Sequence, residues 1–399
     1  MNTSISVSGQ KISETELLSY VIRHCSLLDF PLAWWRLPSS QTKHLLIAEK
    51  HQQLGKDTIL EELQTGFIFS PFDRTKDSIY LKADYIFSVD NGTLTPPQTP
   101  LEIASRTWLE EQLKKENWKK LHVARSGKKT SAAQLDQDRF MELIAKSIRE
   151  IEKGTFEKIV PSRTREIALP AEFDVVKAFE KLCAKYPNAF ISFVNIPGLG
   201  SWLGASPELL VSVEDNAIFK TVALAGTKPY LEGTNLRTVA WTQKEIEEQA
   251  LVERYVISCF KKIRLREYDE YGPKTVVAGN LMHLKSEFMV DMKATNFPQL
   301  GSIMLQLLHP TSAVCGMPLE PALEFLKQNE NYDREFYAGY LGPVNVQNNI
   351  DIFVNLRCMQ LCDTHAILYA GAGVTVDSVA EQEWEETEMK FNTLLNVIF

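Results

Sequence analysis

Hydrophobic residues recur along the chain with spacings that predict both helices and strands. In LDQDRFMELIAKSIREIEKG they fall at three- and four-residue intervals between positions 140 and 151, which predicts an amphipathic helix. TQKEIEEQALVERYVISCFKKIRL predicts a longer helix, and VVKAFEKLCAKYP a shorter one. FEKIVPSRTREIAL predicts a strand, and residues 189–230 predict several strands joined by tight turns. Because strands and helices do not alternate strictly, we predict an α+β fold with antiparallel sheets.

The first 134 residues carry a weaker pattern. SETELLSYVIRHCSLLD predicts a helix capped by Ser13, with Glu16 three residues further on. Short apolar strands are predicted in FPLAWWRLP, KHLLIAE and TGFIFSPF, and the alternation in SIYLKADYIFSVD predicts one more. The polar stretches NGTLTPPQTP and ARSGKKTSAAQ are rich in turn residues, so we expect linkers or mobile loops there.

The composition is that of an ordinary globular protein, with 44% hydrophobic and 24% charged residues among 399. A net charge of −8, without any block of Lys and Arg, argues against nucleic acid as a partner. The chain has no signal-peptide pattern and no uncharged apolar run of roughly 18 residues, so we expect no membrane association. The six Cys give no disulfide framework, and Cys358 and Cys362 lack the second pair that zinc would need. We therefore expect a cytoplasmic protein.

Two pairs of glutamates have the spacing of a single helix face. Glu383, Glu386 and Lys390 lie three and four residues apart in EWEETEMK, and Glu245 and Glu248 repeat the first interval in QKEIEEQ. Four carboxylates on two helices suit Mg²⁺, which usually takes one or two of them directly and keeps water and substrate oxygens. A solvated helix face has the same spacing, so the pattern alone leaves both interpretations open.

Ten segments, in this order, resemble the chorismate-utilising enzymes, which include anthranilate synthase component I, aminodeoxychorismate synthase, salicylate synthase and isochorismate synthase. The segments are KIVPSR, WLGASPELLV, ALAGT, KEIEEQ, LMHL, LHPTSAVCGMP, NYDREFYAG, VNLRC, YAGAGV and EWEETEMK. The resemblance covers residues 135–399 and implies that they form the chorismate-binding catalytic region. It also implies one large domain of two face-packed antiparallel sheets surrounded by helices, with the site between the sheets. Residues 1–134 would be a poorly patterned N-terminal part of the same domain.

The resemblance gives two residues catalytic roles. Lys158 in KIVPSR matches the lysine that activates water in isochorismate and salicylate synthases; an ammonium becomes a base only where burial or a nearby cation lowers its pKa. Glu208 in GASPELL matches the general acid, which must be protonated at neutral pH, and the apolar residues after it favour a raised pKa. Without the family context, Lys158 reads as an exposed strand residue and Glu208 as a capping carboxylate.

Two alanines separate the branches of the family. Ala225 in ALAGT stands where aminodeoxychorismate synthases carry a nucleophilic lysine, and alanine cannot form a covalent adduct. Ala313 in HPTSAVCG matches the alanine of the isochorismate-forming branch, although the neighbouring Ser312 leaves the register open. The sequence shows no glutamine amidotransferase segment, which is a further argument against the aminating branches.

The resemblance also assigns the glutamates. Glu248 and Glu386 match the direct ligands of Mg²⁺, and Glu245 and Glu383 match residues that hold metal-bound water. The metal would then grip the ring carboxylate of chorismate. Gln249 departs from the family pattern, which usually has His after the metal-binding Glu, so we expect metal binding that is tuned and not lost.

A second group of residues would bind the substrate. Arg357 and Tyr337 match the clamp on the enolpyruvyl carboxylate, for which arginine offers a planar fork. Lys390 and the backbone amides near Gly371 and Gly373 would complete the anion pocket, because glycine lets the backbone approach a ligand closely. By sequence alone the two glycines could equally form a plain turn.

The remaining matches line the predicted cleft. His283 in LMHL matches a histidine that orients substrate hydroxyls, although a lone His in an apolar run is often structural. Thr227, Thr311 and Gly316 match the pocket wall. Pro161 replaces a common Leu in the lysine motif and, lacking an N–H, suits a strand edge or a bulge.

Together these matches imply an isochorismate synthase, an intramolecular hydroxyl-transferring isomerase. Water would attack C2 of chorismate and the C4 hydroxyl would leave, with Mg²⁺ as the cofactor. We expect the product to serve menaquinone or siderophore biosynthesis, and we expect a monomer. The alternatives are a salicylate synthase, which also eliminates pyruvate, and a non-catalytic relative that binds chorismate.

Overall fold

Two nine-stranded sheets form the centre of the computed structural model, which describes residues 4–7, 10–13, 19–22, 24–25, 28–90, 93–115, 136–278 and 281–399. The first sheet has the order β11 (Ser162–Ala168), β22 (His365–Gly371), β21 (Cys358–Leu361), β13 (Gly200–Ser206), β12 (Phe190–Ile196), β3 (Leu32–Arg36), β4 (Lys43–Ile47), β8 (Tyr85–Asp90), β9 (Thr93–Leu94). The second has the order β16 (Asp269–Ala278), β17 (Leu281–Asp291), β15 (Ile218–Pro229), β14 (Leu209–Glu214), β20 (Ile350–Val354), β19 (Tyr340–Val344), β6 (Gly66–Ser70), β7 (Ser78–Lys82), β5 (Gln52–Leu54). Neighbouring strands in both sheets are antiparallel, which confirms the predicted fold class.

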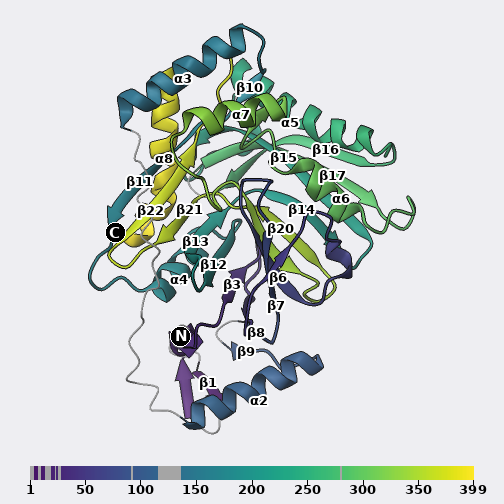
Figure 1. The fold of residues 1–399 in the computed structure, drawn as a ribbon, viewed down its shortest axis with the longest axis vertical. Coiled ribbons are helices and arrows are strands. Elements are labelled where there is room, and N and C mark those ends of the chain that lie inside the picture. The colour runs from purple at the N-terminus through teal and green to yellow at the C-terminus, as the bar shows by residue number, and fades with distance from the viewer. Residues whose placement is uncertain are drawn as a thin grey trace.

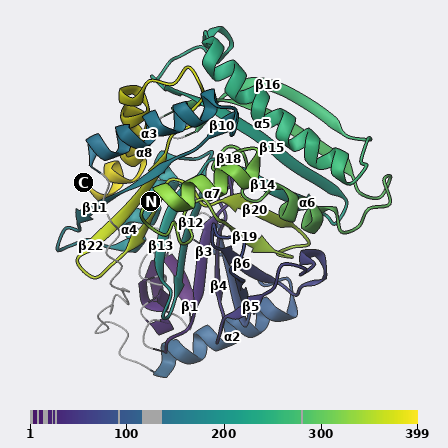
Figure 2. The same ribbon diagram turned by 45° about the horizontal axis from the view of Figure 1, so that its top comes forward.

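Helices pack around the two sheets, as Figure 1 and Figure 2 show. They are η1 (Leu60–Glu62), α2 (Pro100–Lys115), α3 (Gln137–Glu152), α4 (Val175–Lys185), η3 (Leu236–Thr238), α5 (Gln243–Lys262), α6 (Leu300–Leu308), α7 (Leu319–Asn329) and α8 (Ala380–Ile398). Helices α4 and α8 contact the first sheet, whereas α5 and α6 contact the second. None of the described helices is both long and apolar enough to cross a membrane.

The caps of two helices explain why their predicted bounds hold. The side chain of Asp136 accepts from the backbone N of Arg139 over 3.0 Å, so α3 begins where its apolar stripe begins. Thr242 and Glu245 form a capping box at the start of α5. Both helices therefore lie within two or three residues of the predicted ranges.

The strand predicted over residues 156–169 is wrong as a single element. Lys158–Ile159 (β10) pairs with Gly316–Met317 (β18) in a small sheet of its own, and β11 forms an edge of the first sheet. Pro161 lies at the break, because a residue without an N–H cannot continue the ladder. The residue predicted to suit an edge or a bulge thus separates two strands.

The helix predicted from Ser13 is described only in part. Ser13 is the last residue of β2 (Gln10–Ser13), which pairs with β1 (Ser4–Val7). The helical residues described in this region are 19–22 and 24–25, within the predicted range. Residues 14–18 lie outside the described residues, so the cap at Ser13 stays a prediction.

The two predicted linkers have different outcomes. ARSGKKTSAAQ, residues 124–134, lies outside the described residues. NGTLTPPQTP contains β9 and ends at the first residue of α2, so only part of it is irregular. Helix α2 packs on β8, where Trp108 stacks on Tyr85 with ring centroids 4.4 Å apart.

Aromatic contacts fix the face-to-face packing of the sheets. Phe190 of β12 stacks on Phe353 of β20 with centroids 4.2 Å apart, so the inner faces of the two sheets meet. Trp34 points to the other side of the first sheet and stacks on Phe179 of α4 at 3.6 Å. The core therefore has one layer between the sheets and another beneath α4 and α8.

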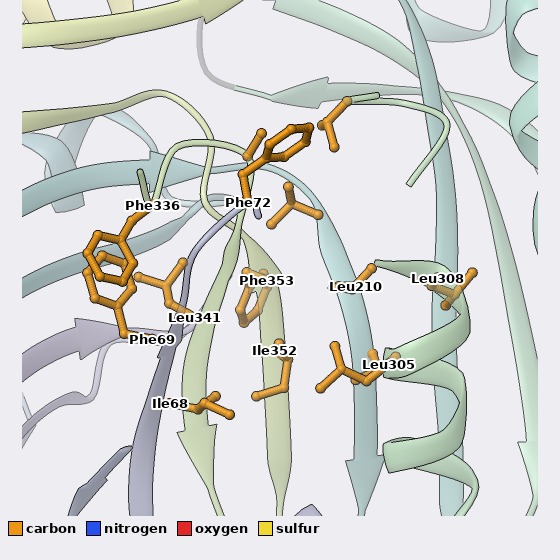
Figure 3. Close-up of a cluster of buried hydrophobic side chains, with 14 of the residues drawn as sticks. Ile68, Phe69, Phe72, Leu210, Leu305, Leu308, Phe336, Leu341, Ile352 and Phe353 are labelled. Atoms are coloured by element: carbon orange, nitrogen blue, oxygen red, sulfur yellow. The ribbon is translucent and has the colours of Figure 1, made fainter. Parts of the chain in front are cut away.

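Helix α6 covers part of the second sheet with leucines. Figure 3 shows Leu305 and Leu308 of this helix beside Leu210 of β14 and near Ile352 of β20. All four side chains are buried. This layer lies at the side of the sheet away from Phe190.

Candidate active site

One cavity collects most of the predicted site residues. Its walls come from the turn before β14, the strands β15, β17 and β22, the helices α5 and α8, and the loops around residues 313 and 357. The predicted residues that line it are Glu208, Thr227, Glu248, His283, Ala313, Tyr337, Arg357, Gly371, Gly373, Glu386 and Lys390. Ala225 lines the same cavity. Segments from all ten motifs thus converge on one space.

Lys158 lies directly behind this wall. Its side chain is fully buried, and its Nζ lies 2.9 Å from Oε1 of Glu248, close enough for an ion pair although the angles are not those of a hydrogen bond. A Cβ at Gly373 would collide with the Glu248 carboxylate and lie 3.3 Å from Cε of Lys158. Glycine at 373 therefore lets the backbone approach both residues. The interpretation of Lys158 as an exposed strand residue is excluded.

Glu208 is a buried carboxyl held by one long hydrogen bond. Only 4% of the residue is exposed, and Thr311 Oγ1 donates to Glu208 Oε1 over 3.3 Å. Burial raises the pKa of Glu208 to about 7, against the opposing positive charge of Lys158. A large fraction of this carboxyl is therefore protonated at neutral pH, which is the state that a general acid needs.

Arg357 and His283 form a second buried pair. Arg357 Nη2 lies 3.4 Å from His283 Nε2, and His283 Nδ1 lies 2.6 Å from the carbonyl oxygen of Gly226. Because a carbonyl only accepts, Nδ1 carries the proton and Nε2 accepts from Arg357. Burial, and then the charge of Arg357, lower the pKa of His283 to about 3, so the ring is neutral. Burial lowers the pKa of Arg357 to about 10, which still leaves a cation at the cavity wall.

Lys390 makes its contacts at the opposite wall. Its Nζ donates to Glu386 Oε1 over 2.6 Å and to the carbonyl oxygen of Gly371 over 2.7 Å. The backbone group of Gly371 that contacts Lys390 is therefore its carbonyl oxygen. We predicted that backbone amides near Gly371 and Gly373 complete an anion pocket with Lys390, and a carbonyl cannot bind an anion. A Cβ at Gly371 would lie 3.1 Å from the hydroxyl of Tyr337, which itself stacks on Tyr369. Gly371 thus permits close packing and is more than a plain turn residue.

The four predicted metal residues do not form one cluster. Glu248 and Glu386 line the cavity, whereas Glu245 completes the capping box of α5. Glu383 is 1% exposed and pairs with Lys244 over 2.5 Å. Within the described ranges, no three or more His, Cys, Asp or Glu side chains lie close enough together to hold a metal ion.

The two cavity glutamates nevertheless fit a magnesium ion. Mg²⁺ is usually bound through one or two carboxylates, with water and substrate oxygens completing its shell. Burial, and then the negative charge of Glu386, raise the pKa of Glu383, so the carboxylates on α8 repel each other. A divalent cation between α5 and α8 would relieve this repulsion.

Two predicted neighbours of the site lie outside the cavity. Gln249 Nε2 donates to the carbonyl of Ala223 over 3.1 Å and to Glu253 Oε1 over 3.2 Å, and not to a predicted metal ligand. Gly316 lies in β18, where a Cβ would be 2.5 Å from the carbonyl oxygen of Lys158. Gly316 therefore permits the strand pairing that positions Lys158.

A buried ion pair that the sequence analysis missed joins two walls of the cavity. Arg334 pairs with Glu330 over 2.5 Å and donates to the carbonyls of Val160 and Val314, over 2.7 and 2.8 Å. Both valines line the cavity. Glu330 in turn accepts from the backbone N of Ser162 over 2.8 Å. The available signal was the i, i+4 spacing of Glu and Arg around NYDREFYAG.

Comparisons with known proteins show what this chain is similar to. The family model described as "Chorismate binding enzyme" matches residues 76–399. The isochorismate synthase EntC of Escherichia coli K12 is 29% identical over 267 residues, which are 66% of this chain and 67% of that protein. The vibriobactin-specific isochorismate synthase of Vibrio cholerae is 28% identical over 244 residues, 60% of this chain and 61% of that protein. The solved structure of MenF, the menaquinone-specific isochorismate synthase from Escherichia coli, has a TM-score of 0.72 at 20% identity, covering 92% of this chain and 89% of that one.

Proposed function

The chain belongs to the family of chorismate-binding enzymes, and on that premise we propose that it is an isochorismate synthase. One observation carries the proposal: a buried carboxyl with a pKa near neutrality and a buried lysine lie at one cavity that also presents two cations. Glu208 is that carboxyl and Lys158 that lysine. Arg357 and Lys390 supply the cations, as a substrate with two carboxylates requires.

The reaction needs one base and one acid. Lys158, as the neutral amine, takes a proton from water as the water oxygen forms a bond to C2 of the chorismate ring. Both ring double bonds shift, the bond between C4 and its hydroxyl oxygen breaks, and Glu208 gives its proton to the departing hydroxyl. One water enters and one leaves, so the net reaction is an isomerisation of chorismate to isochorismate.

Charged side chains would hold the substrate dianion in place for this exchange. Arg357 and Tyr337 would bind the enolpyruvyl carboxylate, and Lys390 would contribute a second positive charge. His283 would position Arg357, because its Nε2 faces the guanidinium. Because the substrate is held in one orientation, the attack of water on C2 does not depend on a chance collision.

Magnesium would complete the site. Glu248 and Glu386 would hold it directly, whereas Glu245 and Glu383, predicted to act through water, are engaged by the capping box and by Lys244. When bound, the metal would neutralise the ring carboxylate of the substrate and the acidic faces of α5 and α8. The ion pair between Lys158 and Glu248 would then weaken, because the carboxylate would face the metal as well.

Product analysis tests the proposal. Purified protein is incubated with chorismate and Mg²⁺, and the products are separated by chromatography. Isochorismate is the expected product, and no pyruvate should appear. Salicylate with pyruvate would instead show a salicylate synthase, anthranilate would show an aminating enzyme, and unchanged chorismate would show a non-catalytic binder; each of these overturns the proposal.

The residues of the site do not distinguish between the pathways that consume isochorismate. We propose that the isochorismate serves menaquinone biosynthesis, with siderophore biosynthesis as the alternative. The likeness to a menaquinone-specific and to a vibriobactin-specific enzyme supports both. A strain that lacks this gene should need added menaquinone precursor for respiratory growth; a need for added siderophore alone would decide for the alternative.

A further inference from the structure

Each of three glutamates at the end of the catalytic cavity formed by α5 and α8 is paired with one lysine. The pairs, with distances of 2.9, 2.5 and 2.6 Å from Nζ to the carboxylate, are Lys158 with Glu248, Lys244 with Glu383, and Lys390 with Glu386. Each pair is neutral as a whole. A divalent cation bound here would add two positive charges beside three ammonium groups, which repel it. Metal binding is therefore favoured if one of these lysines gives up its glutamate.

Lys244 is the lysine best placed to leave its partner. The side chain of Lys158 is fully buried, and Lys390 also donates to the carbonyl oxygen of Gly371 over 2.7 Å. The side chain of Lys244 is 22% exposed, and its ammonium has one hydrogen-bond partner among the described residues, Oε1 of Glu383. Lys244 can therefore turn to water without becoming a buried and unpaired cation.

The position of Lys244 in its helix gives no local reason for a lysine. Lys244 follows the first residue of α5, and the positive end of the helix dipole disfavours a cation in this first turn. The capping box of Thr242 and Glu245 completes this helix end without Lys244. The favourable interaction of Lys244 is therefore the one with Glu383 of α8, which is almost fully buried. A carboxylate this buried needs a compensating cation whenever no metal supplies one.

The other glutamates at this end of the cavity also act on Lys244. Burial lowers the pKa of Lys244, but the negative charges of Glu383, Glu386 and Glu248 outweigh burial, so its pKa lies above the usual value. Lys244 thus carries its positive charge in the field of the two glutamates that we assign to magnesium. An ammonium and a magnesium ion in the same field repel each other.

We propose that Lys244 is an internal cation that competes with magnesium for the glutamates of α5 and α8. In the metal-free protein its ammonium compensates Glu383. When the metal binds, Lys244 turns to solvent and Glu383 becomes free for the role that the family resemblance implies, which is to hold metal-bound water. Lys244 thereby keeps the affinity for magnesium below what the glutamates alone would give. This inference rests on the magnesium site of the proposed function.

Titration of Mg²⁺ into the full chain, followed by isothermal titration calorimetry without chorismate, measures this competition directly. We expect Lys244→Gln to bind Mg²⁺ about tenfold more tightly than the parent, because one positive charge near the metal is gone. Lys261→Gln changes an exposed lysine near the other end of α5 and is the matched control, which should bind Mg²⁺ as the parent does. In the Glu383→Gln background the gain from Lys244→Gln should be smaller, because no carboxylate is freed. The titrations are run at about pH 8, which favours the ionised glutamates.

Thermal unfolding separates competition from a purely structural ion pair. Without metal, Lys244→Gln should lower the thermal midpoint, because Glu383 stays buried without its cation. Saturating Mg²⁺ should raise the midpoint of this variant more than that of the parent, since the metal takes over the compensation. A midpoint that falls equally with and without Mg²⁺ would show that the pair only joins α5 to α8, and it would overturn the proposal.

The same titrations distinguish failure of this inference from failure of the proposed function. Mg²⁺ binding that is weaker in Lys244→Gln than in the parent, or equal to it, overturns the inference and leaves the magnesium site standing. A parent and a variant that both fail to bind Mg²⁺ overturn the magnesium site and the inference together. Tighter binding in Lys244→Gln, with the control unchanged, supports both.

Discussion

The carboxyl groups at the two ends of the catalytic cavity differ in the side chains that contact them. At the end formed by α5 and α8, Glu248, Glu383 and Glu386 each lie within 2.9 Å of a lysine Nζ. At the other end, Glu208 receives one hydroxyl hydrogen bond of 3.3 Å and makes no ion pair among the described residues. Burial raises the pKa of Glu208 to about 7, so this carboxyl keeps a proton, whereas Glu248 and Glu386 lie at the end that suits a metal. Glutamate can therefore serve as a general acid at one end and as a metal ligand at the other, depending on the side chains around it.

The largest effect is expected at the isolated carboxyl. Glu208→Gln keeps the shape but removes the transferable proton, so kcat should fall about 10²–10⁴-fold. The thermal midpoint should not fall, because a buried titrating carboxyl is replaced by a neutral group. Glu214→Gln, at the exposed end of β14, is the control and should keep full activity. Retention of more than a tenth of the activity in Glu208→Gln would contradict the assignment of this residue as the acid.

Removal of the buried lysine should have a similar but separable effect. Lys158→Ala should lower kcat about 10²–10⁴-fold, while chorismate binding measured by calorimetry changes little, because Lys158 lies behind the wall. Lys153→Ala, an exposed lysine five residues earlier, is the control. A variant that loses binding and turnover in parallel would mean that Lys158 holds the substrate instead of activating water.

The acidic end should control the need for metal. Glu386→Gln should raise the Mg²⁺ concentration for half-maximal activity about 10–100-fold, and a chelator should abolish activity reversibly. Glu385→Gln changes the exposed neighbour on the same helix and should leave the Mg²⁺ dependence unchanged. Activity that is indifferent to chelator would rule out the metal.

The pH dependence of kcat should report the protonation of Glu208. Glu208 must be protonated to act, and its pKa is raised to about 7, so kcat should fall as the pH rises above about 7. This limb should be absent from the residual activity of Glu208→Gln. The raised pKa also means that the folded state binds this proton more tightly than the unfolded chain, so the contribution of Glu208 to stability declines as pH rises from about 4.5 through 7.

The smallest effect is expected from the hydrogen bond to Glu208. Thr311→Val removes a donor that favours the ionised carboxyl, so the pKa of Glu208 should rise and the alkaline limb should move up by less than one pH unit. The rate at pH 6 should change less than about threefold. A downward movement of the limb would show that Thr311 acts in another way.

Much of the fold could be predicted from periodic patterns, and the exceptions have physical reasons. The α3 and α5 helices are amphipathic and capped, so pattern and structure agree. The break at Pro161 depends on which strand β10 pairs with, a contact between residues more than 150 positions apart that local pattern cannot show. The pairing of β1 with β2, which ends at Ser13, was likewise not predicted, because such short strands are too brief to show a clear alternation.

The residues of the site could be predicted only from the family resemblance, whereas periodic patterns predicted much of the fold. Resemblance placed Glu208, Arg357 and Lys390 at one cavity, as the structure has them. The carboxylate of Glu245 accepts hydrogen bonds in the capping box of α5. The spacing of the glutamates could not predict this, because a capping residue and a metal ligand can occupy the same helix position. The spacing of Glu330 and Arg334 indicated an ion pair, but the role of Arg334 depends on carbonyls in two other segments, which local spacing cannot show. The monomeric state and the cytoplasmic location stay predictions.

Two early strands each have one partner far downstream. β3 pairs with β12 only once residues 191–195 are made, and β6 pairs with β19 only once residues 340–344 are made. Contacts this distant close slowly and leave hydrophobic edges open during synthesis. Nascent chains should therefore rely on chaperones until translation is nearly complete, and a truncated product that ends before residue 340 should accumulate as aggregate.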